Sequence, residues 1–251
     1  MKSICFEIKN LYKIFNDKSV ALNNINLDIY EGETLIIAGS NGSGKTLLMH
    51  IITGLTDPTS GKVIFRGIDI EKAGNELRKK TGIVFQDADA QIIGETVLDD
   101  IYFGPKNLKY NKHEIETAAA HALKAMHLED KKDFPPCTLS GGEKRRLAIA
   151  GILAMGCEII IMDEPFANLD YNGVKQTLHA VKELKESNKT VIILTHELEK
   201  VLAFAERLVI INSGVIADDG KPQEVLDRLK PEYAVRDPRQ VYKTADDCSW
   251  I

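Results

Sequence analysis

The sequence predicts an α/β fold in which a parallel β-sheet carries a phosphate-binding loop, an antiparallel β region precedes this sheet, and an α-helical subdomain is inserted into it. Three observations predict this fold. Four short apolar runs each end in polar residues, which is typical of buried parallel strands. Apolar and polar residues alternate near the N-terminus, and a helix-rich stretch separates the second apolar run from the third.

The phosphate-binding loop is the most specific of these features. Residues 39–46 read Gly-Ser-Asn-Gly-Ser-Gly-Lys-Thr and satisfy the pattern G-x-x-x-x-G-K-[S/T], between an expected strand at 34–38 and an expected helix. The glycines let backbone N–H groups face an anion. Lys45 can pair with the β- and γ-phosphates, and the Thr46 hydroxyl can ligate Mg²⁺. We expect a nucleoside triphosphate to contact Gly39, Ser40, Asn41, Gly42, Ser43, Gly44, Lys45, Thr46 and Leu47.

The composition is that of an ordinary soluble protein. The 251 residues are 27% charged and 44% hydrophobic, and the formal net charge of −5 argues against nucleic acid as the main partner. The run Leu147 to Met155 is far shorter than the roughly 20 residues of a membrane-spanning helix. A signal peptide is not expected at the N-terminus, because the acidic Glu7 comes before any long apolar region forms. Reduced structural thiols are expected, because no metal-ligand spacing relates Cys5, Cys137, Cys157 and Cys248.

Two antiparallel strands are expected before the loop. Residues 3–9 and 25–29 alternate in part, which predicts one buried face made of Ile4, Phe6, Ile8, Ile25, Leu27 and Ile29. Tyr12 and Phe15 lie between the two strands. Either ring can stack on a nucleotide base, for about 1–3 kcal/mol, or pack in the core. Residues 61–67 continue the antiparallel region.

The remaining chain alternates strands with helices. Residues 82–85 form a buried strand that ends at Gln86, and Asn111 caps a helix through Met126. We expect an inserted helical lobe at about residues 87–155. Strands at 159–162, 191–194, 208–211 and 215–217 and a helix from Pro222 to Leu229 follow.

The polar ends of the apolar runs are expected to meet at one edge of the sheet. The loop ends the first run, Gln86 the second, Asp163 and Glu164 the third, and His196 the fourth. Asp163 is suited to hold Mg²⁺, and Glu164 to polarise an attacking water. His196 can bond the γ-phosphate, and Gln86 can sense Mg²⁺ or the water. The sequence therefore predicts a site that hydrolyses a nucleotide.

A second anion-receptive helix start lies at Leu139-Ser140-Gly141-Gly142-Glu143, called the signature below. Ser140 is a good N-cap, and the two glycines expose the backbone before a helix that begins Lys144-Arg145-Arg146. One triphosphate does not need two such cradles from one subunit. We therefore expect two subunits arranged head to tail, each offering its signature to the nucleotide on the other's loop.

Together these motifs resemble the ATP-binding subunits of ABC transporters, from Phe6 to about Leu229. The resemblance implies a RecA-like P-loop NTPase fold that binds ATP and Mg²⁺, an ATPase domain at 1–229, and a tail at 230–251 that is a candidate for dimer or partner contact. It assigns base stacking to Phe15, Mg²⁺ to Thr46, Gln86 and Asp163, and catalysis to Glu164, His196, Gln86 and Lys45. It also assigns the D-loop to Asp170 and γ-phosphate contact across the dimer to Ser140 and Gly142, with Gly141 among the nucleotide-binding residues.

A narrower resemblance begins with the Q-loop, residues 86–92. The sequence resembles the cobalt-type or energy-coupling-factor (ECF) ATPases in Gln-Asp-Ala-Asp-Ala-Gln-Ile, then in Thr96-Val97 and Phe103-Gly104-Pro105. It departs from them at two positions, because this chain has Ala88 where the family usually has proline and Glu143 where glutamine is commoner. The resemblance implies a subunit on the cytoplasmic side of the membrane that hydrolyses ATP to import a vitamin or a transition-metal ion. Its partners would be a second ATPase, identical or related, an integral membrane coupling component and a substrate-binding membrane component.

Other classes of nucleotide-binding protein fit less well. A GTPase would carry Asn-Lys-x-Asp, which residues 111–114 do not supply, and a small-molecule kinase would not need the signature. Chromosome-maintenance and DNA-repair ATPases share the signature but insert a long coiled coil between the two halves of the domain. The roughly ninety residues between the phosphate-binding loop and the signature leave no room for it. A single-domain ABC ATPase with a soluble partner, such as iron–sulfur assembly machinery, stays open. Copurification with integral membrane proteins would distinguish it from an importer subunit.

Overall fold

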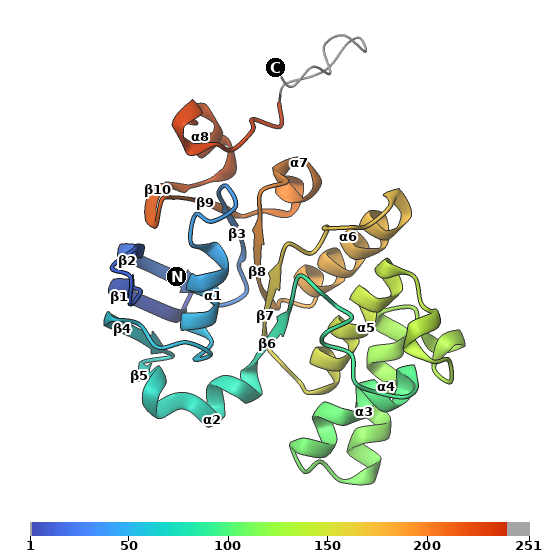
Figure 1. Ribbon diagram of the computed structural model, residues 1–251. Helices are drawn as coiled ribbons and strands as arrows, with labels where there is room; N and C mark the ends of the chain where they lie inside the picture. Colours follow the sequence, from blue (N-terminus) through green and yellow to red (C-terminus); the bar gives the residue numbers. More distant parts are fainter. Residues whose placement is uncertain (1, 240–251) are drawn as a thin grey trace, which may run out of the picture.

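A six-stranded and a four-stranded β-sheet form the body of the computed structural model, which describes residues 2–239 (Figure 1). The larger sheet has the order β10-β9-β3-β8-β7-β6. Five strands are parallel, and β10 pairs antiparallel with β9 at one edge. The strands are β3 Thr34–Ala38, β6 Thr81–Val84, β7 Ile159–Asp163, β8 Thr190–Thr195, β9 Arg207–Asn212 and β10 Val215–Gly220. The predicted α/β fold class is confirmed.

Three of the four apolar runs, β3, β8 and β7, lie inside this sheet, and the fourth, β6, forms one of its edges. Every residue of β3, β7 and β8 is buried, as a covered parallel sheet requires. β8 lies between β3 and β7. The residues that follow these three strands therefore leave the sheet at the same edge, as predicted.

The smaller sheet is antiparallel and has the order β2-β1-β4-β5. Its strands are β1 Ile4–Ile14, β2 Val20–Tyr30, β4 Ser60–Phe65 and β5 Ile68–Asp69. Helix α1 (Lys45–Ile52) lies between the two sheets and shares one apolar core with both (Figure 1). The prediction that Ile4 faces this core was wrong. Ile4 is 39% exposed and Cys5 is buried instead, because the β1–β2 register shifts between Ile4 and Phe6.

Three further details differ from the sequence-based expectation. Helix α2 (Ile70–Lys80) was not predicted, since only Ala73 and Leu77 of its eleven residues are buried and most of the others are charged or polar. β6 ends at Val84, and Phe85, expected to be buried, is 37% exposed. Helix α8 (Pro222–Asp227) ends before Leu229.

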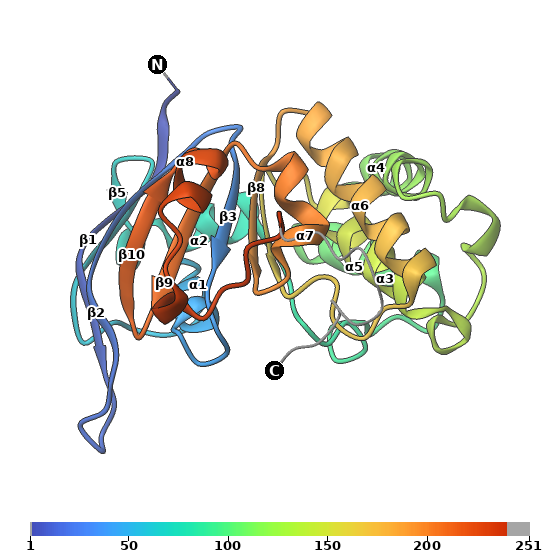
Figure 2. The same ribbon diagram turned by 90° about the horizontal axis from the view of Figure 1, so that it is seen from above.

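A helical lobe is inserted between β6 and β7, on the far side of the larger sheet from the smaller one (Figure 2). It contains α3 (Val97–Asn107), α4 (Lys112–Ala125) and α5 (Gly141–Ala154). Asn111 caps α4 in a reciprocal capping box with Glu114, as predicted. α5 packs directly on β6 at Gly82, where a Cβ would lie only 2.1 Å from Cγ2 of Ile152. The absence of a side chain at Gly82 therefore allows this close contact.

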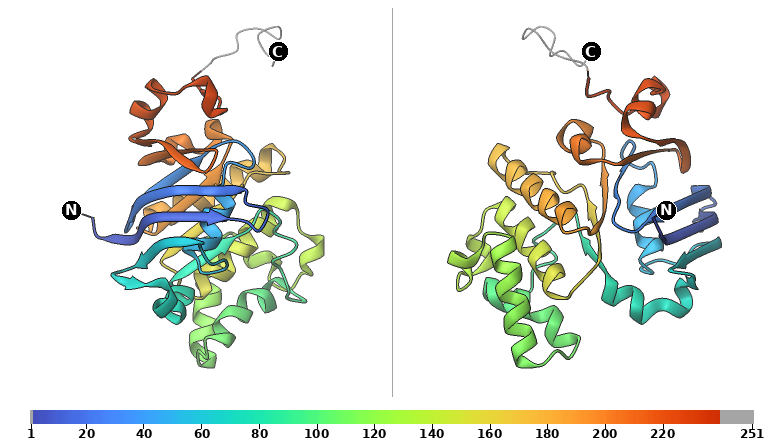
Figure 3. Two further views of the ribbon diagram at one scale, coloured as in Figure 1. Left: turned by 60° about the vertical axis from the view of Figure 1, so that its left-hand side comes forward. Right: turned by 180° about the vertical axis from the view of Figure 1, so that it is seen from behind.

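The last strand and helix, β10 and α8, lie at the opposite end of the molecule from α3 and α4 (Figure 3). α6 (Tyr171–Glu186) connects β7 to β8, and α7 (Leu198–Val201) follows β8. Short 3₁₀ turns occupy Glu129–Lys131, Pro136–Thr138, Leu202–Phe204 and Pro231–Tyr233. In the predicted tail, Tyr233 and Val235 are buried in the core, whereas residues 240–251, with Cys248 and Trp250, lie outside the described residues.

The described cysteines are free thiols, of which Cys5 and Cys157 are buried and Cys137 is exposed. Burial raises the pKa of Cys5 to about 12 and that of Cys157 to about 11, so neither forms a reactive thiolate at neutral pH. Within residues 2–239, none of the helices combines the length and apolarity of a membrane span.

Candidate nucleotide-binding site

The phosphate-binding loop joins β3 to α1, as its sequence predicts. Gly42 and Gly44 have φ values of 80° and 110°, which residues with a Cβ rarely adopt. A Cβ at Gly39 would lie 2.2 Å from the carbonyl oxygen of Ile211, so only glycine fits beneath the loop. These glycines keep the backbone close to the sheet and leave its N–H groups available to an anion.

Lys45 lies at the start of α1, and its side chain is 5% exposed. Its Nζ donates to the carbonyl oxygens of Gly39 at 2.8 Å and Ser40 at 3.1 Å. Burial lowers the pKa of Lys45, and the charges of Glu164 and Asp163 oppose that shift. The ammonium group is thus held at the loop by backbone oxygens.

Thr46 and Asp163 form the part of the site that can hold a divalent cation. Thr46 Oγ1 donates to Asp163 Oδ2 at 2.7 Å. Asp163 Oδ1 is buried and has no hydrogen-bond partner among the described residues. Burial raises the pKa of this carboxyl, against the hydrogen bond from Thr46. A hydroxyl and a carboxylate with a free oxygen suit Mg²⁺, which prefers oxygen ligands.

Glu164 follows β7 and has the left-handed φ of 43°, a conformation that is uncommon outside glycine and recurs at functional sites. Its N–H donates to the carbonyl of Leu194 at 2.8 Å. Thr195 Oγ1 donates to Oε2 at 3.0 Å, and His196 Nδ1 lies 2.9 Å from Oε1. The carboxylate is therefore oriented by the end of the neighbouring strand β8. Thr195 is not among the site residues predicted from the sequence, although it directly precedes His196 after an apolar run.

Lys45, Thr46, Glu164 and His196 line one cleft of about 460 Å³, called the nucleotide cleft below, whereas Asp163 and Thr195 are not among its lining residues. Phe15 is 48% exposed at its wall, whereas the alternative ring, Tyr12, lies within β1 and does not line it. Gln86 borders the same cleft. The structure thus brings most of the predicted residues to one place, and the cleft is lined by Phe15, Ala21, Asn41, Gly42, Gly44, Lys45, Thr46, Leu47, Gln86, Glu164 and His196.

The remaining loop residues, Gly39, Ser40 and Ser43, are not among the residues that line this cleft. Gly39 and Ser40 hold Lys45 through their carbonyl oxygens. Ser43 is buried, and its hydroxyl has no hydrogen-bond partner among the described residues.

The signature, residues 139–143, does not line the nucleotide cleft. Ser140 caps α5 in a capping box with Glu143, whose carboxylate accepts from Ser140 N at 2.8 Å and pairs with Lys131 at 2.8 Å. Burial opposes ionisation of Glu143, but hydrogen bonds from Lys131 and Ser140 lower its pKa overall. Gly141 borders a second cavity of about 380 Å³, beside Gln86.

Gly142 and Asp170 also lie outside the nucleotide cleft. A Cβ at Gly142 would lie 2.7 Å from Cα of Gly173, so α5 and α6 touch there. Asp170 caps α6 by accepting from Gly173 N at 2.7 Å. Among the described residues, neither the signature nor Asp170 lines the nucleotide cleft. The phosphate-binding loop and the signature of one chain therefore do not meet at one site.

Comparison with known proteins identifies the site's family. The sequence profile of the ABC transporter family matches residues 22–167. The energy-coupling factor transporter ATP-binding protein EcfA of Methanocaldococcus jannaschii is 40% identical over 222 residues, which are 87% of this chain and 80% of that protein. EcfA2 of Methanospirillum hungatei is 42% identical over 221 residues, 87% of this chain but 56% of that protein.

Two solved structures extend the likeness to the fold. CbiO1 from Clostridium perfringens, described as part of the ABC transporter complex cbiONQ, has a TM-score of 0.84 and 34% identity, covering 92% of this chain and 93% of that one. The dimeric bacterial ABC transporter cassette MJ0796 has a TM-score of 0.75 and 33% identity, covering 86% and 98%. The chain therefore belongs to the ABC transporter family, in which it is an ATP-binding ATPase.

Proposed function

We propose that this chain binds and hydrolyses ATP to energise an ECF-type importer of a vitamin or a transition-metal ion. The relatives from M. jannaschii and M. hungatei are named as ECF transporter ATP-binding proteins, and CbiO1 is described as part of an ABC transporter complex. These names favour an importer over the soluble iron–sulfur assembly partner. The chain would act at the cytoplasmic side of the membrane, bound to integral membrane components.

The environment of Glu164 carries the hydrolytic part of the proposal. The carboxylate is 6% exposed, accepts from Thr195, contacts His196 and lies 3.7 Å from Lys45 Nζ. Such a fixed carboxylate can take a proton from a water that attacks the γ-phosphate. His196 then fixes the position of the base through Nδ1 and offers its other ring nitrogen to the phosphate or the water. Lys45 neutralises the β- and γ-phosphates.

The remaining residues of the cleft would bind the rest of the nucleotide. Thr46 and Asp163 would hold Mg²⁺, with Gln86 as a third oxygen donor, and the ion would neutralise charge on the phosphates. Phe15 would stack on the base, since its ring is exposed at the wall of the cleft. No side-chain contact to the base edge is needed for this mode of binding.

The proposal requires a second ATPase subunit. Ser140 begins α5 outside the chain's own nucleotide cleft, with its helix N-terminus and two glycines suited to an anion. A head-to-tail partner, identical or related, would bring its nucleotide to this helix start, with Asp170 close to the shared interface. Closure of two subunits on two ATP molecules would supply the work, because ligand binding shifts an equilibrium between open and closed dimers.

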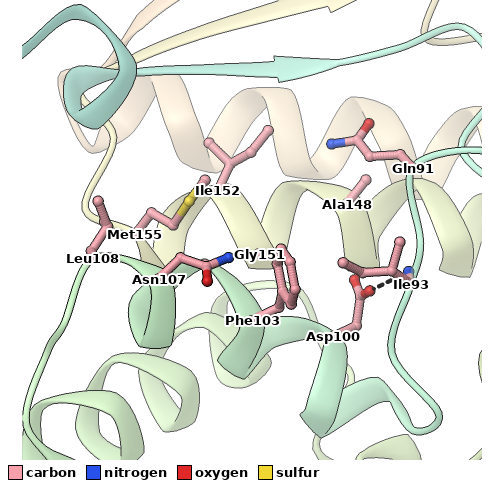
Figure 4. A pocket seen from close by; sticks show the side chains of 11 residues that line it. Gln91, Ile93, Asp100, Phe103, Asn107, Leu108, Ala148, Gly151, Ile152 and Met155 are labelled. Atoms are coloured by element: carbon pink, nitrogen blue, oxygen red, sulfur yellow. Dashed lines mark hydrogen bonds between the residues drawn. The ribbon is translucent and has the colours of Figure 1, made fainter. Parts of the chain in front are cut away.

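A groove on the helical lobe is the proposed contact for the membrane coupling component. It has a volume of about 280 Å³ and lies between α3 and α5, with Phe103 and Ile152 on facing helices and Ile93 and Met155 at its ends (Figure 4). Ile93 is 58% and Phe103 50% exposed. The groove is mainly apolar and includes Gln91 of the Q-loop, so we propose that a short cytoplasmic helix of the coupling component fills it.

Substitution of Glu164 tests the hydrolytic proposal. Glu164→Gln should still bind ATP, hydrolyse it at least about 100-fold more slowly, and form an ATP-dependent dimer with itself or its companion ATPase. Glu197→Gln is the matched control, because the Glu197 side chain pairs with Lys200 instead of the cleft residues. Hydrolysis by Glu164→Gln at the parent rate would refute the role of Glu164.

Purification of the native complex tests the transport proposal. The chain should copurify with integral membrane proteins, and vesicles holding the complex should take up a vitamin or a transition-metal ion only with ATP. Recovery with a soluble partner alone would refute the importer and support the iron–sulfur type of assembly.

A further inference from the structure

Helix α5 carries two buried arginines just after the signature. Arg145 is 2% and Arg146 is 7% exposed, although a sequence of Lys-Arg-Arg usually marks a solvated surface. A buried guanidinium needs hydrogen-bond partners, because an unpaired buried charge is costly. Each arginine donates to backbone carbonyl oxygens of a different segment, so each fixes the position of that segment relative to α5.

Arg145 reaches the start of the Q-loop. Its Nη1 donates to the carbonyl oxygen of Phe85, and its Nη2 donates to that of Gln86 at 2.8 Å. Nε is buried without a hydrogen-bond partner among the described residues, so these two carbonyls fix the guanidinium. The same residue, Gln86, borders the nucleotide cleft.

Two further contacts join α5 to this segment. Lys144 Nζ, on the preceding residue, pairs with Asp89 Oδ1 at 2.5 Å. Farther along the helix, Ile152 packs where Gly82 leaves room in β6. Helix α5 thus contacts β6 and the Q-loop at three points, of which Arg145 is the one that touches Gln86 itself.

We propose that Arg145 is a positioning residue that makes Gln86 move together with the signature. The inference rests on the proposed function, in which Ser140 contacts the nucleotide on the partner's loop whereas Gln86 faces the chain's own nucleotide. When the partner's ATP draws Ser140 and α5 toward it, the two hydrogen bonds from Arg145 carry the displacement to the backbone of Gln86. Binding at one site thereby adjusts hydrolysis at the other.

The chemistry of the guanidinium suits this task. Its N–H groups form a rigid planar fork that holds two acceptors at once, whereas a lysine ammonium is a flexible point donor and methionine donates nothing. Arg146 provides a matched control on the same helix. Its Nη1 donates to the carbonyls of Met126 and His127 at the end of α4, and neither residue borders the nucleotide cleft.

Mixed dimers test the direction of this coupling. One subunit carries Glu164→Gln, so that only the other hydrolyses ATP. Arg145→Met in the hydrolysing subunit should reduce kcat by about 2- to 30-fold, the range of coupling effects within proteins. In the Glu164→Gln subunit it should change kcat less than twofold. The opposite pattern would overturn the proposal, because it would mean that Arg145 merely supports the signature that the active site receives from that subunit.

A double-mutant cycle tests whether Arg145 acts through Gln86. Arg145→Met should lower kcat in the parent but have less than a twofold effect in a Gln86→Ala background, whereas Arg146→Met should have the same effect in both. Equal effects of Arg145→Met in the two backgrounds would overturn the inference. If Arg145→Met does not fold, Arg145→Lys is used in the same cycle, and an additive result overturns the inference equally.

The outcome is separable from the fate of the proposed function. If Glu164→Gln traps an ATP-dependent dimer but the cycle is additive, only the role of Arg145 fails. If Glu164→Gln hydrolyses ATP at the parent rate, the proposed function itself fails.

Discussion

Thr46 and Asp163 lie 117 residues apart in the sequence and share a hydrogen bond of 2.7 Å at the edge of the central sheet. Thr46 belongs to the first turn of α1 after β3, and Asp163 is the last residue of β7. Only β8 separates these two strands, so the sheet order sets the distance between hydroxyl and carboxylate. The pair defines the proposed magnesium position.

Asp163→Asn should lower the Mg²⁺-dependent ATPase rate at least about 100-fold, because the anionic ligand is lost. It should also stabilise the nucleotide-free protein at neutral pH. Burial raises the pKa of Asp163 when the chain folds, so stability is lost as pH rises from about 3.9 through the raised pKa. Asparagine does not ionise. The melting temperature of the variant in EDTA should therefore exceed that of the parent by an amount that grows with pH across this window, and a gap independent of pH would contradict the argument.

His196→Ala should reduce kcat by about 100-fold while ATP still binds, because the carboxylate of Glu164 loses the imidazole that orients it. Steady-state ATPase assays and titration with a fluorescent ATP analogue separate the two effects. His179→Ala, on the exposed face of α6, is the control and should match the parent. Loss of nucleotide binding with unchanged kcat would assign His196 to binding instead.

Phe15→Ala should weaken ATP binding about 5- to 150-fold, since loss of a stacking ring costs about 1–3 kcal/mol. Phe15→Tyr keeps the ring and should restore most of the affinity. Phe134→Ala is a matched control, because that ring is also 48% exposed but does not line the nucleotide cleft. Equilibrium binding measures all three variants, and an unchanged affinity of Phe15→Ala would exclude stacking at this residue.

Phe103→Asp should abolish copurification with the membrane coupling component, because a carboxylate would be buried in the apolar groove between α3 and α5. Phe134→Asp introduces the same charge on the lobe outside the groove and should retain the complex. The melting temperature of each purified chain checks that it folds. A complex that survives Phe103→Asp would place the membrane contact elsewhere.

Gly82→Ala should destabilise the protein by about 1–3 kcal/mol, because its Cβ would overlap Ile152 in the contact between β6 and α5. Gly151→Ala, in the interior of α5, meets no atom within 4 Å and should stabilise it by about 0.5–1 kcal/mol. Urea denaturation measures both values. Equal free energies of unfolding for the two variants would show that the β6–α5 contact is looser than described.

The sequence by itself determined the features that depend on local chain chemistry. The phosphate-binding loop, the caps at Asn111 and Ser140 and the strand below the loop each follow from residues within one short segment. The convergence of Gln86, Glu164 and His196 was also predictable, since parallel strands place their carboxyl ends at one edge. The resemblance to ABC ATPases added the choice of Phe15 over Tyr12.

Only the tertiary structure decided the features that depend on which segments meet. The register shift that buries Cys5 and exposes Ile4 depends on β2, and α2, which buries only Ala73 and Leu77, depends on its neighbours for its place. The burial of Arg145 is the clearest case. The charge of Arg145 predicts a solvated side chain. The packing of α5 on β6 instead brings the carbonyl oxygens of Phe85 and Gln86, some sixty positions away in the sequence, to the guanidinium, and these acceptors allow the side chain to be buried.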